Sequence, residues 1–306
     1  MSLIVVQNLR KSYGARVVLD GISFEVERGE TFALIGPTGA GKTTTLGILE
    51  GYHQRDAGDV LVAGLDPGLG SPRLRRRIGI VLQETALEPE LTVQETVRAF
   101  SRYYPQALSV DRVLDFVALR RAERQRAATL SPGQKRRLEI ALAVIGDPEV
   151  LFLDEPTAGL DSEARRSLWR VIAALNGEGK TILLSSPDME EVEALAGRLA
   201  ILLDGRILAS GQPHELQQAL GPEPTVELHL GGAALPRLFP QTLRAIASFE
   251  RGWVRLKCRD PGPVAYELLL WAVRHQYDLS SLTIARPSLE ALYLQATRRG
   301  AQEAAC

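Results

Sequence analysis

The sequence predicts an α/β protein with a mostly parallel sheet, a helical insertion and a small α+β domain at the C-terminal end. An apolar strand at residues 31–35 runs into a glycine-rich loop and then a helix. Strand-like and helical runs alternate again from residue 150, as in proteins with a parallel sheet. Gly221-Pro222-Glu223-Pro224 then breaks the pattern. We therefore expect a first domain over residues 1–220 and an accessory domain over residues 222–306.

The first half of the chain reads as strands followed by helices. We expect strands at residues 3–7, 22–26, 31–35, 60–62 and 79–82, and a helix at residues 42–49. Apolar residues at helical spacing then predict helices within 91–104 and 110–119, with Thr92 and Ser109 as N-caps. This change predicts a helical subdomain over residues of about 87 to 148.

Short strands return in the second half. Strands are expected at 150–153, 181–184 and 199–203, and they alternate with helices at 162–175 and 188–196. Beyond the break, the expected elements are strands at 225–230, 252–257 and 282–285, and helices at 264–275 and 287–298. The last group predicts the small α+β domain.

The glycine-rich loop fits the phosphate-binding pattern G-x-x-x-x-G-K-[ST]. Glycines let backbone N–H groups turn toward phosphate oxygens, and the N-terminus of the next helix adds partial positive charge. A glycine-rich turn with a solvent lysine is the alternative, but the strand before the loop and the helix after it favour phosphate binding. The expected nucleotide contacts are Gly36, Pro37, Thr38, Gly39, Ala40, Gly41, Lys42, Thr43 and Thr44.

Two adjacent carboxylates, Asp154 and Glu155, follow the apolar strand at 150–153. The carboxyl ends of strands are where open α/β sheets bind ligands. A like-charged pair there is costly without a cation, so Asp154 is expected to hold Mg²⁺, directly or through water. Glu155 is then placed to accept a proton from an attacking water. The alternative reading is a solvated acidic turn.

Together these motifs resemble the ATP-binding subunit of ABC transporters over residues 1 to about 220. Tyr13, in KSYG, resembles the aromatic residue that stacks on adenine, and Gln83 resembles the Q-loop glutamine. LSPGQ at 130–134 resembles the signature loop, and Asp161 ends a segment that resembles the D-loop. The resemblance implies ATP and Mg²⁺ as cofactors, with Glu155, Gln83 and Lys42 in catalysis and Thr43, Gln83 and Asp154 at the metal.

The resemblance also implies two subunits packed head to tail, as a homodimer or a heterodimer. Each ATP would lie between one subunit's phosphate loop and the other's signature loop, touched there by Ser131, Gly133 and Gln134. Ser131 is also suited to N-cap a helix that begins at Pro132. A transmembrane permease would be the further partner, so that this chain would lie in the cytoplasm at the inner face of the membrane.

The C-terminal motif PSLEALYL at 287–294 resembles the ending of ATPases that serve ABC-2 type permeases, among them drug, antibiotic and sodium exporters. Its alternative reading is an amphipathic helix capped by Ser288. Two positions depart from the family pattern: Pro132 replaces a signature glycine, and Pro187 stands where the family has a histidine that contacts the γ-phosphate. We expect little effect from Pro132, and from Pro187 either slow hydrolysis or pairing with a different ATPase subunit.

Composition sets further limits. With 36 basic and 37 acidic residues and few aromatics, no nucleic-acid partner is expected. Two cysteines are too few for a disulfide framework, and neither a signal peptide nor an 18-residue apolar run is visible, which predicts a soluble cytosolic chain. Two other functions stay open: a soluble ATP clamp outside transport, and a binding-only regulatory subunit. The substrate, the direction of transport and the role of residues 222–306 are not encoded in these motifs.

Overall fold

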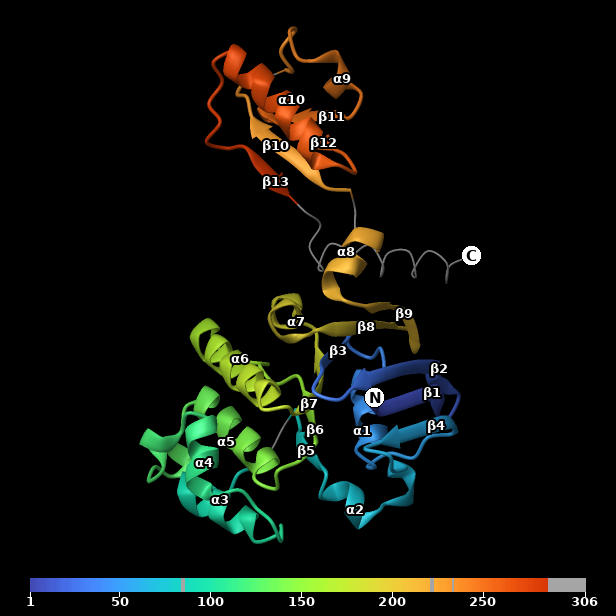
Figure 1. The fold of residues 1–306 in the computed structure, drawn as a ribbon, viewed down its shortest axis with the longest axis vertical. Coiled ribbons are helices and arrows are strands. Elements are labelled where there is room, and N and C mark those ends of the chain that lie inside the picture. The colour runs from blue at the N-terminus through green and yellow to red at the C-terminus, as the bar shows by residue number, and fades with distance from the viewer. Residues whose placement is uncertain (84–85, 221–222, 233, 286–306) are drawn as a thin grey trace. The chain divides into compact units, whose positions relative to one another are not determined.

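The computed structural model describes residues 1–83, 86–220, 223–232 and 234–285 (Figure 1). The chain forms two compact units, Met1–Pro213 and a second that begins at His214. Within the described residues, no helix has the length and apolar character that crossing a membrane requires.

A six-stranded sheet forms the centre of the first unit. Its strand order is β5-β6-β7-β3-β8-β9; the first five strands are parallel, and β9 is antiparallel to β8. The strands are β5 (Ile78–Val81), β6 (Val150–Asp154), β7 (Thr181–Ser186), β3 (Thr31–Ile35), β8 (Arg198–Leu203) and β9 (Arg206–Gly211). β3, β6 and β7 are buried along their whole length, which explains their apolar runs. The predicted mostly parallel sheet is confirmed, and β9 was not anticipated.

A separate antiparallel sheet has the order β2-β1-β4, with β1 (Ser2–Tyr13), β2 (Arg16–Glu27) and β4 (Ala57–Val62). Its inner face shares a core with the central sheet, where Phe24 stacks on Phe32 with ring centroids 5.5 Å apart. The strands predicted at 3–7 and 22–26 were too short. They extend to a tight hairpin in which Tyr13 pairs with Arg16, and this hairpin is important for the candidate site.

Helices complete the first unit. They are α1 (Lys42–Leu49), α2 (Pro72–Arg75), α3 (Val93–Ser101), α4 (Val110–Phe116), α5 (Pro132–Val144), α6 (Ser162–Gly177) and α7 (Met189–Leu195). Thr92 and Ser109 cap α3 and α4 as predicted, each accepting from a backbone N–H one turn on. The span between α4 and α5 contains only two 3₁₀ turns, so the helical segment is less continuous than the sequence suggested.

The second unit is an α+β arrangement with a four-stranded antiparallel sheet in the order β11-β12-β10-β13. Its elements are β10 (Thr225–His229), α9 (Gln241–Arg244), β11 (Ala247–Glu250), β12 (Trp253–Lys257), α10 (Pro261–Arg274) and β13 (Thr283–Ala285); α8 (Pro213–Leu220) precedes them. Leu268 and Trp271 of α10 pack with Val226 and Val254 of the sheet. The helix predicted at 287–298, and with it the motif at 287–294, lies outside the described residues.

Candidate functional site

The glycine-rich loop connects β3 to α1 and depends on glycine at two places. Gly41 has φ of +108°, and a Cβ there would lie 2.6 Å from Leu19 Cδ2. A Cβ on Gly36 would lie 2.3 Å from the backbone oxygen of Leu202, closer than real atoms approach. The loop is therefore held tightly against β2 and β8, and it ends at the N-terminus of α1, where backbone N–H groups favour an anion.

Lys42, the first residue of α1, turns back over the loop. Its Nζ donates to the backbone oxygens of Gly36 at 2.9 Å and Pro37 at 3.2 Å, and the side chain is buried. Burial lowers the pKa of Lys42, while the charges of Glu155 and Asp154 oppose that change. The same ammonium group is thus within electrostatic reach of both the loop and the two carboxylates.

The two carboxylates occupy the end of β6 with different surroundings. Asp154 is buried and accepts a hydrogen bond from Ser185 Oγ of the adjacent strand β7. Glu155 leaves the strand with φ of +44°, and its N–H donates to the backbone oxygen and to Oγ of Ser185, both at 3.1 Å. Gln83 Nε2 donates to Glu155 Oε2 at 3.3 Å. The structure therefore brings together Lys42, Gln83 and the adjacent pair Asp154 and Glu155, four residues from three parts of the sequence.

Three threonines follow Lys42 on the first turns of α1. Thr43 is exposed on the first turn of α1, Thr44 is half-buried, and the unpredicted Thr45 is buried with its hydroxyl donating to the backbone oxygen of Gly41 at 2.8 Å. Within the described part of the chain there is no group of three or more His, Cys, Asp or Glu side chains suited to a metal. The candidate ligands Thr43, Gln83 and Asp154 offer a hydroxyl, an amide and one carboxylate. Such a small set of oxygen donors fits Mg²⁺, which usually takes one or two protein ligands together with water and phosphate oxygens.

Tyr13 is the last residue of β1, at the tight hairpin to β2. Its ring is half exposed, and Lys11 Nζ lies 5.1 Å from the ring centroid. Its strand partner Arg16 reaches over the loop, because a Cβ built on Gly39 would lie 3.5 Å from the Arg16 guanidinium. Arg16 was not predicted as a site residue from the sequence. Its position three residues after Tyr13 fits a tight hairpin turn, which would have placed the two side by side.

The signature loop sits at another helix start. Ser131 caps α5 in a capping box: its Oγ accepts from the Gln134 N–H, and the Gln134 side chain accepts from the Ser131 N–H. Gly133 packs against α6, where a Cβ would lie 2.8 Å from Ala164 Cβ. Asp161 caps α6 by accepting from the Ala164 N–H at 2.8 Å. Among the described residues, no hydrogen bond or ion pair joins Ser131, Gly133 or Asp161 to the phosphate loop of the same chain.

Arg136 is a structural residue that the sequence reading missed. Its buried guanidinium donates to the backbone oxygens of Leu82, Asp154, Glu155 and Pro156 at 2.6 to 3.2 Å, and it pairs with Glu139. It therefore holds the residue before Gln83 and the end of β6 against α5. Because it lies within the basic run KRR at 135–137, the sequence alone gave no reason to expect it to be buried.

Pro187 lies in the exposed turn between β7 and α7, and Asp188 caps the helix that follows. Ser186 Oγ accepts from the Asp188 N–H and donates to the buried Glu191 carboxylate at 2.6 Å. Thr157 also donates to Glu191, at 2.9 Å. The buried Glu191 carboxylate thus links Ser186, the residue before Pro187, to Thr157, which lies two residues after Glu155.

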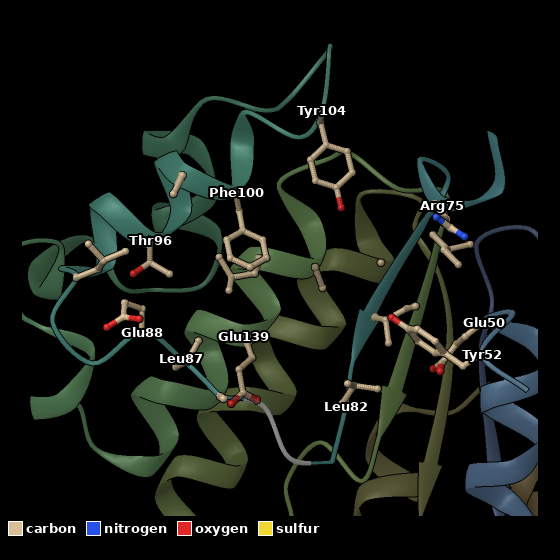
Figure 2. A pocket seen from close by; sticks show the side chains of 18 of the residues that line it. Glu50, Tyr52, Arg75, Leu82, Leu87, Glu88, Thr96, Phe100, Tyr104 and Glu139 are labelled. Atoms are coloured by element: carbon tan, nitrogen blue, oxygen red, sulfur yellow. The ribbon is translucent and has the colours of Figure 1, made fainter. Parts of the chain in front are cut away.

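A pocket of about 630 Å³ opens between the strand edge and the helical segment (Figure 2). Apolar side chains such as Leu82 and Phe100 line it together with Glu50, Glu139 and Arg75. Burial, with the charge of Asp154 adding to it, raises the pKa of Glu50 to about 7. Burial also raises the pKa of Glu139, against the opposing effect of Arg136. The pocket therefore combines an apolar surface with carboxyl groups.

Comparisons with known proteins agree with this geometry. A family model for ABC transporters matches residues 19–158. The Nod factor export ATP-binding protein I of Ralstonia nicotianae is 38% identical over 97% of this chain and 94% of its own length. The linearmycin resistance ATP-binding protein LnrL of Bacillus subtilis is 33% identical over 96% of this chain and 97% of its own length.

Solved structures of ATP-binding subunits are also similar to this chain. The structure of an ATP binding subunit of an ABC transporter superposes with a TM-score of 0.63 and 30% identity, covering 71% of this chain and 92% of that one. A dimeric ATP-binding cassette in a post-hydrolysis state, bound to ADP and Pi, superposes with a TM-score of 0.61 and 26% identity, covering 68% and 98%.

Proposed function

The chain belongs to the ABC transporter family as an ATP-binding, ATP-hydrolysing subunit, and we propose that it energises a separate permease of the ABC-2 export type. Two relatives that align along almost the whole chain carry names that refer to Nod factor export and to linearmycin resistance. The observation that carries the proposal is the convergence of Lys42, Gln83, Asp154 and Glu155 at the carboxyl end of the parallel sheet.

We assign the following roles at this site. Glu155 accepts the proton of the attacking water, Lys42 neutralises the β and γ phosphates, and Gln83 orients the Glu155 carboxylate that it already contacts. Thr43, Gln83 and Asp154 would hold Mg²⁺, which when bound supplies charge stabilisation at the phosphates. The loop contacts the nucleotide from residue 36 to residue 44, and Tyr13 stacks on the base.

The second half of each ATP site is proposed to come from another subunit. Ser131, Gly133 and Gln134 stand at the N-terminus of α5, whose dipole favours an anion, and Asp161 stands beside them on α6. They make no hydrogen bond to their own phosphate loop in the described chain, which is expected if they serve a neighbour's ATP. Dimeric cassettes among the similar solved structures support such an assembly.

We propose that the pocket between β5 and the helical segment receives a short element of the permease. It opens next to Leu82, the residue before Gln83, so an element seated there would be coupled to the Gln83–Glu155 contact. Residues 1–220 would then act as the ATPase domain and residues 222–306 as an accessory domain. Through the permease the chain would be held at the cytoplasmic face of the membrane.

The permease role is tested first by sequencing the neighbouring genes for a polytopic membrane protein, whose absence would refute it, and then by co-purifying that protein with this chain. Phe100→Asp places a charge in the pocket and should abolish co-purification while leaving ATP affinity unchanged. Tyr103→Asp is the matched control, because Tyr103 packs edge-on against Phe100 but does not line the pocket. Equal retention of the permease by both variants would refute the assignment of this pocket.

The proline at position 187 lowers the rate of ATP hydrolysis that we expect. Loss of one preorganised donor to developing charge costs roughly 10²–10³ in rate in comparable sites. We therefore expect slow hydrolysis with Glu155 still acting as the base, and a gain in kcat for Pro187→His measured as phosphate release at saturating ATP. Glu155→Gln should abolish turnover in both backgrounds and leave binding intact. If Pro187→His gives no gain in kcat at saturating ATP, the hypothesis that Pro187 slows hydrolysis is wrong.

A further inference from the structure

Helix α10 of the second unit has two apolar faces, and among the described residues only one of them is packed against the rest of the unit. Leu268, Trp271 and Ala272 are buried against the four-stranded sheet. The opposite side carries Tyr266, Leu269, Leu270 and Val273, which are 36% to 65% exposed. Their spacing of i, i+3, i+4 and i+7 forms one continuous stripe. We call these four residues the α10 stripe.

The α10 stripe is self-complementary when two copies meet antiparallel. A two-fold axis between Leu269 and Leu270 places Tyr266 of one copy beside Val273 of the other and brings the two Leu270 side chains together. Each large side chain then meets a smaller or equal one across the axis, which is the isologous contact that symmetric dimers use.

The charged side chains at the edge of the α10 stripe also favour the antiparallel orientation over the parallel one. Glu267 and Arg274 lie along the same edge of the α10 stripe, because positions seven apart are almost in line on a helix. With a rise of 1.5 Å per residue, antiparallel pairing brings Glu267 of one copy to within about 3 Å, along the axis, of Arg274 of the other. The pair occurs twice by symmetry. A parallel arrangement puts the two charged edges on opposite sides, so that no such pair forms.

We propose that the α10 stripe is a homodimer contact between the accessory domains of two copies of this chain. Two helix faces bury far less than the roughly 1,200–2,000 Å² of an independent stable interface, so the contact is weak by itself. Because a cassette dimer raises the local concentration of the second copy, a weak contact suffices to hold the subunits together between ATP cycles. The proposal rests on the protein pairing with itself rather than with a different ATPase.

The first test is a symmetric disulfide in the full chain without nucleotide. In a background with Cys258→Ser and Cys306→Ser, Leu270→Cys should form a cross-linked dimer on mild oxidation, since residue 270 lies next to the two-fold axis. Leu238→Cys is the control, being an exposed apolar position of the same unit outside the stripe. Equal cross-linking of both variants, or cross-linking of neither, overturns the proposal.

The second test exchanges charges and is read by analytical ultracentrifugation of the full chain. Glu267→Arg alone and Arg274→Glu alone should each weaken self-association at least tenfold, and the double exchange should restore it. The single Glu267 change also removes its hydrogen bond from Thr242, so restoration by the double exchange is the decisive result. If the stripe is instead covered by residues 286–306 of the same chain or by the permease, neither exchange changes self-association. ATP affinity, measured on the same samples, tests the phosphate site separately.

Discussion

Glu50 makes the stability of the ATPase unit depend on pH. It is the C-cap of α1, the helix that carries Lys42, and its side chain is almost fully buried. Burial raises its pKa from the ordinary value of 4.5 to about 7, and the nearby charge of Asp154 acts in the same direction. The negative end of the α1 dipole adds to the cost of ionising a carboxyl group there.

The sign and size of the effect follow from proton linkage. Between pH 4.5 and 7 the folded protein keeps a proton on Glu50 that the unfolded chain has released, so the free energy of unfolding falls as pH rises through this window. At about 1.4 kcal/mol per pKa unit, the full loss above pH 7 is about 3 kcal/mol. Glu50→Gln keeps the shape of the side chain without the charge, so it should remove this loss.

The assay is urea denaturation of the wild type and Glu50→Gln, followed by far-UV circular dichroism at pH 5 and pH 8. We expect the advantage of the variant to be about 1 kcal/mol at pH 5 and to grow by about 2 to 3 kcal/mol at pH 8. Glu88→Gln is the control, because Glu88 lines the same pocket but is exposed. An advantage of Glu50→Gln that is the same at both pH values would refute the reasoning.

Other predictions concern the phosphate loop and the carboxylates. Gly36→Ala forces a Cβ to within 2.3 Å of the Leu202 backbone oxygen, so it should weaken ATP binding at least tenfold in a fluorescent-nucleotide titration; Gly177→Ala, with open space around its Cβ position, should not. Ser185→Ala removes the donor to Asp154, and it should lower the free energy of unfolding by about 1.5–3 kcal/mol in urea. A loss below about 0.5 kcal/mol would mean that water replaces the hydroxyl.

Much of the fold was predictable because its decisive signals are local. The phosphate loop needs glycine for steric reasons that act within a few residues, and the N-caps at Thr92 and Ser109 have short-range partners. The apolar run at β6 reflects burial on both faces of the sheet, which a single strand displays by itself. The strand lengths of β1 and β2 were missed, because exposed residues near their hairpin have no apolar alternation.

The candidate site was harder to assemble from sequence where partners are distant. The contact of Ser185 with Asp154 depends on β7 lying next to β6, a neighbour relation that no local pattern reveals. The burial of Arg136 depends on four backbone oxygens that converge from two segments. Polar residues whose role is to satisfy backbone groups carry little sequence signal, since the same residue types also cover exposed surfaces.

Arg136 has a consequence for communication between the two ATP sites of a dimer. Its guanidinium donates to the backbone oxygens of Asp154 and Glu155 and to that of Leu82, the residue before Gln83. Its helix, α5, begins at Pro132 and is capped by Ser131. If a neighbour's ATP displaced the N-terminal end of α5, Arg136 would transmit that displacement to the backbone of Glu155, the residue proposed as the base. Binding of ATP at one site of such a dimer would thus change the position of Glu155 at the other site, without any contact between the two nucleotides.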